Sequence, residues 1–523
     1  MKKKLLALFL ALVMVGAVLP GCGDGSKDPG GQGNNGETGE PVKGGEITVG
    51  IAQDLDDSLD PHQTVAAGTR EVLFNIFEGL VKPNSDGEMI PAVAEKYTLS
   101  EDGTTYTFTL REGVKFHNGQ TVTAEDVVYS INRCAAVPEG QEKPLVAAFS
   151  AVKSVEALDE KTVTVTIAQR DLEFISYMTA AIIPAGYADQ ATAPVGTGPF
   201  RFVSRTPQEN FIMERFEDYW GAPAWLDKVT YKICENADAL VMNLNGGSID
   251  LCAHLTSAQA AQLNSNFKVL EGTMNLVQAI YLNNQAKPFD NQLVRQALCY
   301  AIDRQAIVDS VLLGEGMPAY GPLQRNIYND ESVEHYDYNP DKARAILEDA
   351  GCTLGADGFY TRGGEQLAFT ISVMSGEQDR IDIAQAAAQQ IRAIGINCTV
   401  EIPAQMDWGG QMACLIGWGS PFDADDHTYK VFGTDKGANY SSYSNAAVDE
   451  ALTKARQSDD PAVRKAYYAD FQQALAADPA YAFICYIDAN YVAKSNIKGI
   501  DTDTVLGHHG VGIFWNIQNW EIA

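Results

Sequence analysis

Residues 94–130 read AEKYTLSEDGTTYTFTLREGVKFHNGQTVTAEDVVYS, and this stretch decides how the first part of the chain folds. Tyr106, Phe108 and Leu110 alternate with threonines, which predicts a half-buried strand. The HNGQ run supplies a turn, and Thr123 with Asp126 resembles a helix-capping box. The stretch therefore predicts an antiparallel strand, a turn and a helix, which is an α+β arrangement.

Helical signals dominate the second half of the chain. Apolar residues recur at helical spacing from Leu293 to Leu312, and this run predicts a helix that Gly314 ends. In YNPDKARAILEDAG, residues 338–351, Asn339 is the expected N-cap of a second helix, with proline at its first position.

A helix around 383–394 is followed by the strand-like run INCTVEI, and this alternation is typical of an α/β lobe. The final run GIFWNIQNWEI, residues 512–522, reads as a strand-like tail that returns to pair with the first lobe. The predicted fold class is α/β with an α+β subdomain.

The N-terminus has the order of a secretory signal. Three lysines precede an apolar run from Leu5 to Leu19, which is short for a membrane span, and Leu-Pro-Gly then precedes Cys22. This order resembles a bacterial lipobox, in which the cysteine thiol receives a diacylglycerol; Pro20 departs from the usual pattern. We expect a signal peptide over 1–21 and lipidation of Cys22, with plain secretion as the alternative.

Residues 22–43 are rich in Gly, Asn, Asp and Glu, so we expect a flexible tether between the anchor and the folded part. The whole chain has 523 residues, which exceeds what one core usually supports, so two or three domains are expected. Its formal charge of −30 argues against binding to nucleic acid or to anionic lipid headgroups.

Catalytic and metal-binding signatures are missing from the sequence. It contains no G-x-S-x-G elbow, phosphate loop, H-E-x-x-H helix or dinucleotide fingerprint. The glycines of PVGTGPF, residues 194–200, fit a tight turn better than a phosphate cradle. The nine cysteines form no C-x-x-C pair, and we expect those after Cys22 to be mostly buried and reduced. We therefore expect no enzyme activity, no cofactor and no metal ligands.

Several runs together resemble the extracellular solute-binding proteins of the peptide and nickel class, family 5, which serve ATP-binding-cassette importers. They are spread in order over nearly the whole mature chain, and their combination is specific for the family but says little about the ligand. The runs are residues 94–130, PVGTGPFRF (194–202), FEDYWG (216–221), VRQALCYAIDR (294–304), YNPDKARAILEDAG (338–351) and the region of GWGSPFD (417–423).

The resemblance implies a two-lobed periplasmic-binding-protein-like fold of type II, with an extra subdomain in lobe I and the ligand between lobes that close by a hinge. The long runs above are then mainly scaffold and not ligand contacts. By similarity, the boundaries are 44–82, 194–272 and 496–523 for lobe I, 83–193 for the extra subdomain, and 273–495 for lobe II.

The run GWGSPFDADDH, residues 417–427, is the candidate ligand loop. Its aspartates lack the spacing and the glycine of a calcium loop, and it has no partner motif for catalysis. The family's peptide-binding members place an aspartate where this chain has Pro421, and WGSPFD is similar to a Trp-Gly-x-Pro-aromatic-Asp loop of nickel-type members. The resemblance implies that Trp418 and Phe422 line the pocket, and Asp423 is either an amine partner or a loop-capping residue.

Arg70 is the other candidate ligand contact. It lies near a position where family members often present a side chain to the ligand, and a guanidinium can hold a carboxylate with two hydrogen bonds. A solvated arginine at a helix end is the alternative interpretation.

The family resemblance predicts a lipid-anchored receptor that captures oligopeptides and delivers them to an ABC permease and ATPase complex. The alternative within the family is a receptor for nickel or another metal chelate, and the alternative of another class is a secreted surface hydrolase. We expect the protein outside the cytoplasm, anchored to the outer face of the cell membrane, or on the periplasmic side where an outer membrane is present.

Overall fold

The computed structural model describes residues 43–523, except 65, 86–87, 254, 256, 376–377, 404–405, 420–423 and 502–511. Cys22 and the predicted signal and tether up to residue 42 lie outside the described residues. Among those described, no helix has both the length and the apolarity needed to cross a membrane.

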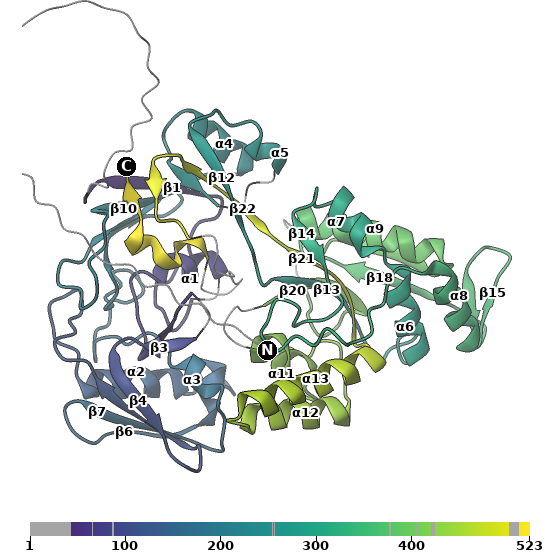
Figure 1. The fold of residues 1–523 in the computed structure, drawn as a ribbon, viewed down its shortest axis with the longest axis horizontal. Coiled ribbons are helices and arrows are strands. Elements are labelled where there is room, and N and C mark those ends of the chain that lie inside the picture. The colour runs from purple at the N-terminus through teal and green to yellow at the C-terminus, as the bar shows by residue number, and fades with distance from the viewer. Residues whose placement is uncertain are drawn as a thin grey trace, which may run out of the picture. The chain divides into compact units, whose positions relative to one another are not determined.

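A seven-stranded mixed sheet forms the core of the first lobe (Figure 1). Its middle strand β1 runs parallel to both neighbours, β10 and β11, and its inward side chains Ile47 and Val49 are buried. The strands, in sheet order, are β12 (Phe267–Gly272), β22 (Ala489–Lys494), β11 (Leu251–Cys252), β1 (Glu46–Ile51), β10 (Lys228–Ile233), β9 (Asn210–Arg215) and β8 (Phe200–Thr206). In chain order, helix α1 (Ala67–Leu73) follows β1, α4 (Ala237–Asn245) follows β10, and α5 (Ser257–Ala260) follows β11.

A four-stranded antiparallel sheet with the helices α2 and α3 and the 3-10 helix η1 forms the predicted α+β region. Tyr106, Phe108 and Leu110 of β5 are buried and alternate with half-buried threonines, which confirms the predicted strand. The Asp126 carboxylate accepts the backbone N–H of Thr123 at 2.8 Å, so the capping box is also confirmed. The elements are β4 (Ala94–Leu99), β5 (Thr105–Leu110), β7 (Thr162–Ile167), β6 (Val152–Ala157), α2 (Ala124–Ala135), α3 (Phe174–Tyr177) and the 3-10 helix η1 (Ala147–Ala151).

A six-stranded mixed sheet carries the second lobe. The helix predicted around 383–394 overlaps α9 (Gln378–Ala393), and the strand after it, β19, pairs in parallel with β18, so the α/β alternation is confirmed. The strands, in sheet order, are β14 (Gly316–Pro318), β21 (Tyr481–Ile487), β13 (Val277–Leu282), β20 (Ala413–Trp418), β18 (Ala368–Ser372) and β19 (Asn397–Glu401).

The helical run predicted from Leu293 to Leu312 is two helices, α6 (Gln292–Ala301) and α7 (Arg304–Ser310). Ile302 is extended, and the Asp303 side chain accepts the Ala306 N–H at 3.0 Å, so a new N-cap interrupts the run. Helix α8 (Pro340–Asp349) has the predicted cap, because Asn339 accepts the Lys342 N–H at 2.9 Å.

The chain crosses between the two large sheets twice, at 273–276 between β12 and β13, and at Asp488 between β21 and β22. Because β22 pairs with β11 and β12, the return to the first sheet comes earlier than the boundary at 495 that we predicted. Arg325 joins both crossings: its guanidinium pairs with the Asp488 carboxylate and donates to the Met274 carbonyl at 2.6 Å.

The end of the chain differs from the prediction. Residues Ile513–Asn519 form a 3-10 helix, η2, and only β24 (Glu521–Ile522) is a strand, pairing with β23 (Ile497–Lys498) and not with the large sheet. Phe514, Ile517 and Trp520 are buried in the first-lobe core, so burial of these side chains, not strand pairing, returns the tail to that lobe.

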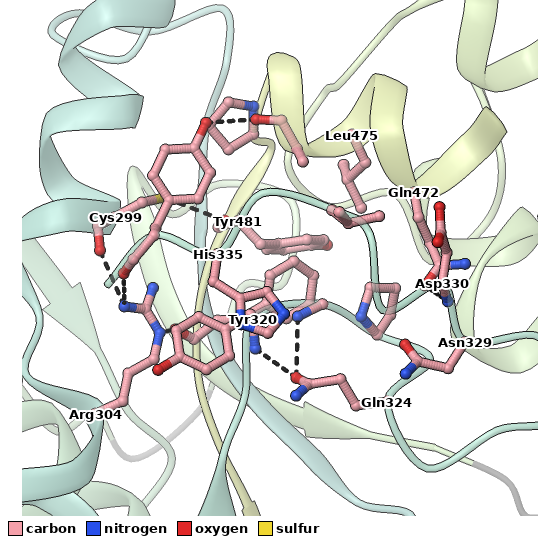
Figure 2. Close-up of a pocket in the computed structure, with 17 residues that line it drawn as sticks. Cys299, Arg304, Tyr320, Gln324, Asn329, Asp330, His335, Gln472, Leu475 and Tyr481 are labelled. Atoms are coloured by element: carbon pink, nitrogen blue, oxygen red, sulfur yellow. Dashed lines mark hydrogen bonds between the residues drawn. The ribbon is translucent and has the colours of Figure 1, made fainter. Parts of the chain in front are cut away.

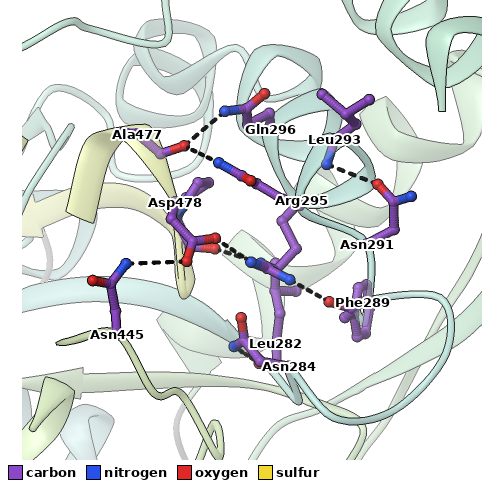
Figure 3. A network of polar contacts seen from close by, with 12 residues as sticks. Leu282, Asn284, Phe289, Asn291, Leu293, Arg295, Gln296, Asn445, Ala477 and Asp478 are labelled. Atoms are coloured by element: carbon purple, nitrogen blue, oxygen red, sulfur yellow. Dashed lines mark hydrogen bonds and ion pairs between the residues drawn. The ribbon is translucent and has the colours of Figure 1, made fainter. Parts of the chain in front are cut away.

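Two of the runs that carry the family resemblance take part in internal polar networks, and Figure 3 shows the network around Arg295. Arg295 donates to the carbonyls of Pro479 (2.9 Å) and Phe289 (2.5 Å) and pairs with Asp478. The indole N–H of Trp220 in FEDYWG donates to Glu78 at 2.6 Å. These side chains are engaged within their own scaffold, as the resemblance implied.

The PVGTGPF glycines are explained by close backbone contact. A Cβ added at Gly196 would lie 2.2 Å from the Ile76 carbonyl oxygen, and one at Gly198 would lie 2.4 Å from that of Asn75. The eight cysteines in the described residues are free and buried, which confirms the expectation for them.

Candidate ligand-binding site

Trp418 is the last residue of β20 and lies opposite Val277, the first residue of β13. It therefore sits at the edge of the second-lobe sheet where the chain has just crossed from the first lobe. Strands β18, β19 and β20 are parallel, and Trp418 is at their carboxyl edge, where ligands of open α/β sheets bind.

The Trp418 side chain is part of an aromatic core. It is 8% exposed, and its ring centroid lies 5.3 Å from that of Tyr481 and 6.1 Å from that of Phe483. Within the described part of the chain, its indole N–H has no hydrogen-bond partner. Trp418 thus combines packing in an aromatic core with a buried hydrogen-bond donor at the sheet edge.

Gly419 couples the candidate loop to the first crossing. Its φ of +155° suits glycine, and a Cβ there would lie 1.8 Å from the Asn275 carbonyl oxygen. Phe422 and Asp423, the other predicted contacts in this loop, lie outside the described residues. The chain is described again from Ala424, in the short helix α10 (Ala424–His427), and His427 is fully buried.

Arg380 is a site residue that our sequence analysis missed. It lies in the first turns of α9, and its Nε donates to the Gln278 side-chain oxygen at 2.8 Å. A Cβ at Gly417 would lie 2.4 Å from Gln278 Nε2 and 2.5 Å from Arg380 Nη2, so glycine at 417 makes room for both side chains. The half-buried Arg380 guanidinium therefore sits beside the residue that precedes Trp418.

One signal in the sequence could have pointed to Arg380. The helix that follows the first strand of a parallel pair begins at the carboxyl edge of the sheet, so a cation in its first turns faces the region where ligands bind. The contact with Gln278, which is distant in sequence, could not be predicted.

Arg70 lies on α1 and is exposed. Its Nε and Nη2 donate to the Thr64 carbonyl at 3.1 and 2.8 Å, which holds the guanidinium against its own segment. The geometry therefore matches the helix-end alternative, and no described contact joins Arg70 to Trp418.

The next residue, Glu71, is buried, and burial raises the pKa of its carboxyl to about 8. Tyr231 and Tyr491 are close enough for Glu71 to raise the pKa of each phenol further, after burial as the main cause. A Cβ at Gly512 would lie 2.2 Å from Glu71 Oε2, so the carboxyl also touches the start of the C-terminal segment. Glu71 is thus a buried acid that carries its proton at neutral pH.

A separate cavity of about 30 Å³ lies within the second lobe (Figure 2). Its lining includes Arg304, Tyr320, His335, Tyr481 and Phe483, and the rings of Tyr320 and His335 stack with centroids 4.3 Å apart. The volume suits roughly two or three water molecules. Because its lining includes Tyr481 and Phe483, which also contact Trp418, the cavity shares the aromatic core with the candidate loop.

No group of three or more potential metal-ligating side chains occurs among the residues that the structure describes. Arg380, Gln278 and Trp418 supply donors and an aromatic ring. This set suits a ligand that offers a carboxylate or carbonyl oxygen and an apolar part.

Comparison with known proteins shows which family this chain resembles. The family model described as bacterial extracellular solute-binding proteins, family 5, middle region, matches residues 88–440. The oligopeptide-binding protein AppA of Bacillus subtilis is 27% identical, over 100% of this chain and 99% of its own length. The glutathione-binding protein GsiB of Pectobacterium atrosepticum is 30% identical, over 82% of this chain and 86% of its own.

Among solved structures, NikZ from Campylobacter jejuni in complex with Ni(L-His) matches with a TM-score of 0.81 and 28% identity. The match covers 91% of this chain and 99% of NikZ. The predicted fold class, a mixed α/β two-lobed binding protein, is confirmed by this similarity.

Proposed function

Because this chain belongs to family 5 of the bacterial extracellular solute-binding proteins, we propose that it is a lipid-anchored receptor that captures oligopeptides and delivers them to a membrane permease driven by an ATPase. Proteins of this family are extracytoplasmic transport receptors and not enzymes. The family therefore confirms that this chain is not an enzyme and leaves the hydrolase alternative without support.

The observation that carries the peptide proposal is that Trp418 and Arg380 lie at the same edge of the second-lobe sheet. The Trp418 ring offers an apolar wall, and its buried N–H can donate to a backbone carbonyl. The Arg380 guanidinium, oriented by Gln278, can hold a terminal carboxylate. The full-length alignment with an oligopeptide-binding protein supports the same ligand class.

We propose that the three other predicted contacts also bind the ligand. Phe422 extends the apolar wall, and Asp423 receives the ammonium group of the ligand. Arg70 approaches the ligand from the first lobe when the lobes close. These three assignments depend on the resemblance of WGSPFD and of the Arg70 region to family members.

A nickel or other metal chelate is the second candidate, because NikZ, a structure solved with Ni(L-His), has the same fold over nearly the whole chain. In that case, the same arginine would hold a carboxylate of the chelating amino acid.

Native mass spectrometry of the protein purified from its own cells tests the ligand class. A bound mass that fragments into peptide sequence supports the proposal, and a mass with a nickel isotope pattern supports the chelate. Calorimetry of the emptied protein with a random tripeptide pool and with Ni(L-His)₂ then gives the preference. Tight binding of neither probe would contradict both assignments.

The lipid anchor is tested at Cys22. Cys22→Ala should move the protein from the membrane fraction to the medium or periplasm and abolish labelling by a radioactive fatty acid. Cys134→Ala, at a buried thiol, is the matched control and should stay in the membrane fraction. Membrane retention of the Cys22 variant would show that another anchor exists.

A further inference from the structure

A second contact between the lobes lies away from the two chain crossings. The segment that follows β7 contains one basic residue, Arg170, and then two acidic residues, Asp171 and Glu173. It meets the end of helix α12 (Ala446–Gln457) and the start of α13 (Pro461–Ala477), which pack on the second-lobe sheet (Figure 1).

Three ion pairs form this contact, and each joins an arginine of one segment to an acidic residue of the other. Arg170 pairs with Asp459 at 2.8 Å, Asp171 with Arg456 at 2.5 Å, and Glu173 with Arg464. We name these three pairs the ionic contact.

The backbone strengthens the same contact. The Leu172 N–H donates to the Arg456 carbonyl at 3.1 Å, and Arg170 Nε donates to the Gln457 carbonyl at 3.0 Å. The partners are separated by more than 280 residues in sequence, as Arg170 and Gln457 illustrate with a separation of 287. Chain connectivity therefore does not hold these segments together.

Two of the pairs are shielded from water. The Asp171 and Arg456 side chains are 11% and 15% exposed, and those of Glu173 and Arg464 are 11% and 18% exposed. Removal of one partner from a shielded pair leaves an uncompensated charge, whereas an exposed pair contributes little. The inner pairs are therefore the sensitive part of the ionic contact.

The second lobe holds its two arginines in place independently of the first lobe. The Arg456 guanidinium lies 4.0 Å from the Tyr429 ring centroid, and that of Arg464 lies 5.3 Å from the Tyr328 ring centroid. Stacking on an aromatic ring of the same lobe limits the conformations of each guanidinium before the acidic segment arrives. The surface is thus prepared to receive Asp171 and Glu173.

We propose that the ionic contact is a latch that stabilises the closed arrangement of the lobes even without ligand. This inference rests on the proposed function, because closure matters only for a two-lobed receptor. A receptor that is partly closed when empty pays less to close on its ligand, and the population of the closed form sets the apparent affinity.

The test measures closure without any ligand, so its outcome does not depend on the ligand class or on transport. Nitroxide labels at Glu139→Cys in the first lobe and Asp470→Cys in the second, both exposed positions, report the distance between the lobes by pulsed electron resonance. Asp171→Asn and Arg456→Gln should each lower the closed-to-open ratio of the empty protein by about tenfold. The double variant should open by less than the product of the two single effects, because both remove one interaction.

Asp290→Asn is the matched control. This substitution also removes one negative charge and breaks an ion pair, the one between Asp290 and Arg362 at 3.2 Å. Both members of that pair lie in the second lobe. The control should keep the wild-type distance distribution, and melting curves should show that all variants are folded. The proposal is overturned if Asp171→Asn and Arg456→Gln give the same distribution as Asp290→Asn.

Discussion

Arg304 and Arg380 belong to the same lobe but have different surroundings. Arg304 is buried and donates to the carbonyl oxygens of five residues: Ala319, Phe483, Cys299, Ile302 and Tyr336. Arg380 is half-buried, stands at the carboxyl edge of the sheet and donates to the side-chain oxygen of Gln278. The first arginine donates to fixed acceptors of its own lobe, while we propose that the second holds a ligand carboxylate. The comparison separates scaffold from binding site within one lobe.

The largest effect is expected at Arg304. Arg304→Met keeps an unbranched aliphatic stem but leaves several buried carbonyls without donors, so the free energy of unfolding should fall by about 4 kcal/mol. Denaturant titration of the empty protein measures this change. Binding by the fraction that stays folded should be unchanged, and a loss of affinity without a loss of stability would reverse the assignment of Arg304 to the scaffold.

Glu71 extends the comparison to a buried acid in the first lobe. The pKa of Glu71 is raised from its ordinary value of 4.5 to about 8 by burial, so the folded state keeps a proton that the unfolded state loses. Folding stability should therefore fall as pH rises from about 4.5 to about 8. Glu71→Gln should remove this slope and stabilise the protein by about 3 kcal/mol at pH 7, with little effect at pH 4.5.

Melting temperatures of both proteins across this pH range check the prediction. Glu101→Gln is a suitable control, because Glu101 is an exposed acid in a turn. Equal slopes for wild type and Glu71→Gln would mean that Glu71 is ionised in the folded protein.

Arg380 should give a smaller effect that appears in affinity and not in stability. Arg380→Gln removes a charge-assisted hydrogen bond to a ligand carboxylate, which is worth about 2 kcal/mol, or about thirtyfold in Kd. The loss should vanish when the peptide carries a C-terminal amide. Arg344→Gln on α8, whose guanidinium pairs with exposed Asp341 at 2.9 Å, is the control and should leave both affinities unchanged.

The parts of the fold that the sequence predicted are those that local interactions determine. The alternation around Tyr106 and the Thr123 cap depend on residues close in the chain, and both are found where expected. The crossing at Asp488 and the buried 3-10 tail depend on partners more than 100 residues away, such as Arg325 for Asp488, so periodicity could not reveal them.

The same limit applies to the candidate site. The aromatic loop around Trp418 has a visible sequence pattern, but the contact of Arg380 with Gln278 links residues separated by 102 positions. Arg70 was predicted from the resemblance alone, and the two hydrogen bonds that its guanidinium donates to the Thr64 carbonyl could not be read from a sequence pattern. A site between lobes is built from tertiary contacts, and sequence patterns show only the parts that one segment supplies.

The smallest effect, and the most discriminating, is expected for Trp418→Phe. Phenylalanine keeps a ring among Tyr481, Phe483 and Phe432 but removes the second ring and the indole N–H. If Trp418 is a core residue, the substitution should lower the free energy of unfolding by about 1–2 kcal/mol. If Trp418 also contacts the ligand, the substitution should weaken binding by about 1 kcal/mol, or about fivefold in Kd, which is the contribution of one neutral hydrogen bond. Stability from denaturant titration and affinity from calorimetry separate the two contributions, because the core cost is already present in the empty protein. Phe432→Leu, which disturbs the same aromatic core without removing a hydrogen-bond donor, supplies the comparison. If both variants lose stability and neither loses affinity, Trp418 belongs with Arg304 in the scaffold, and Arg380 is left to define the second-lobe side of the binding site.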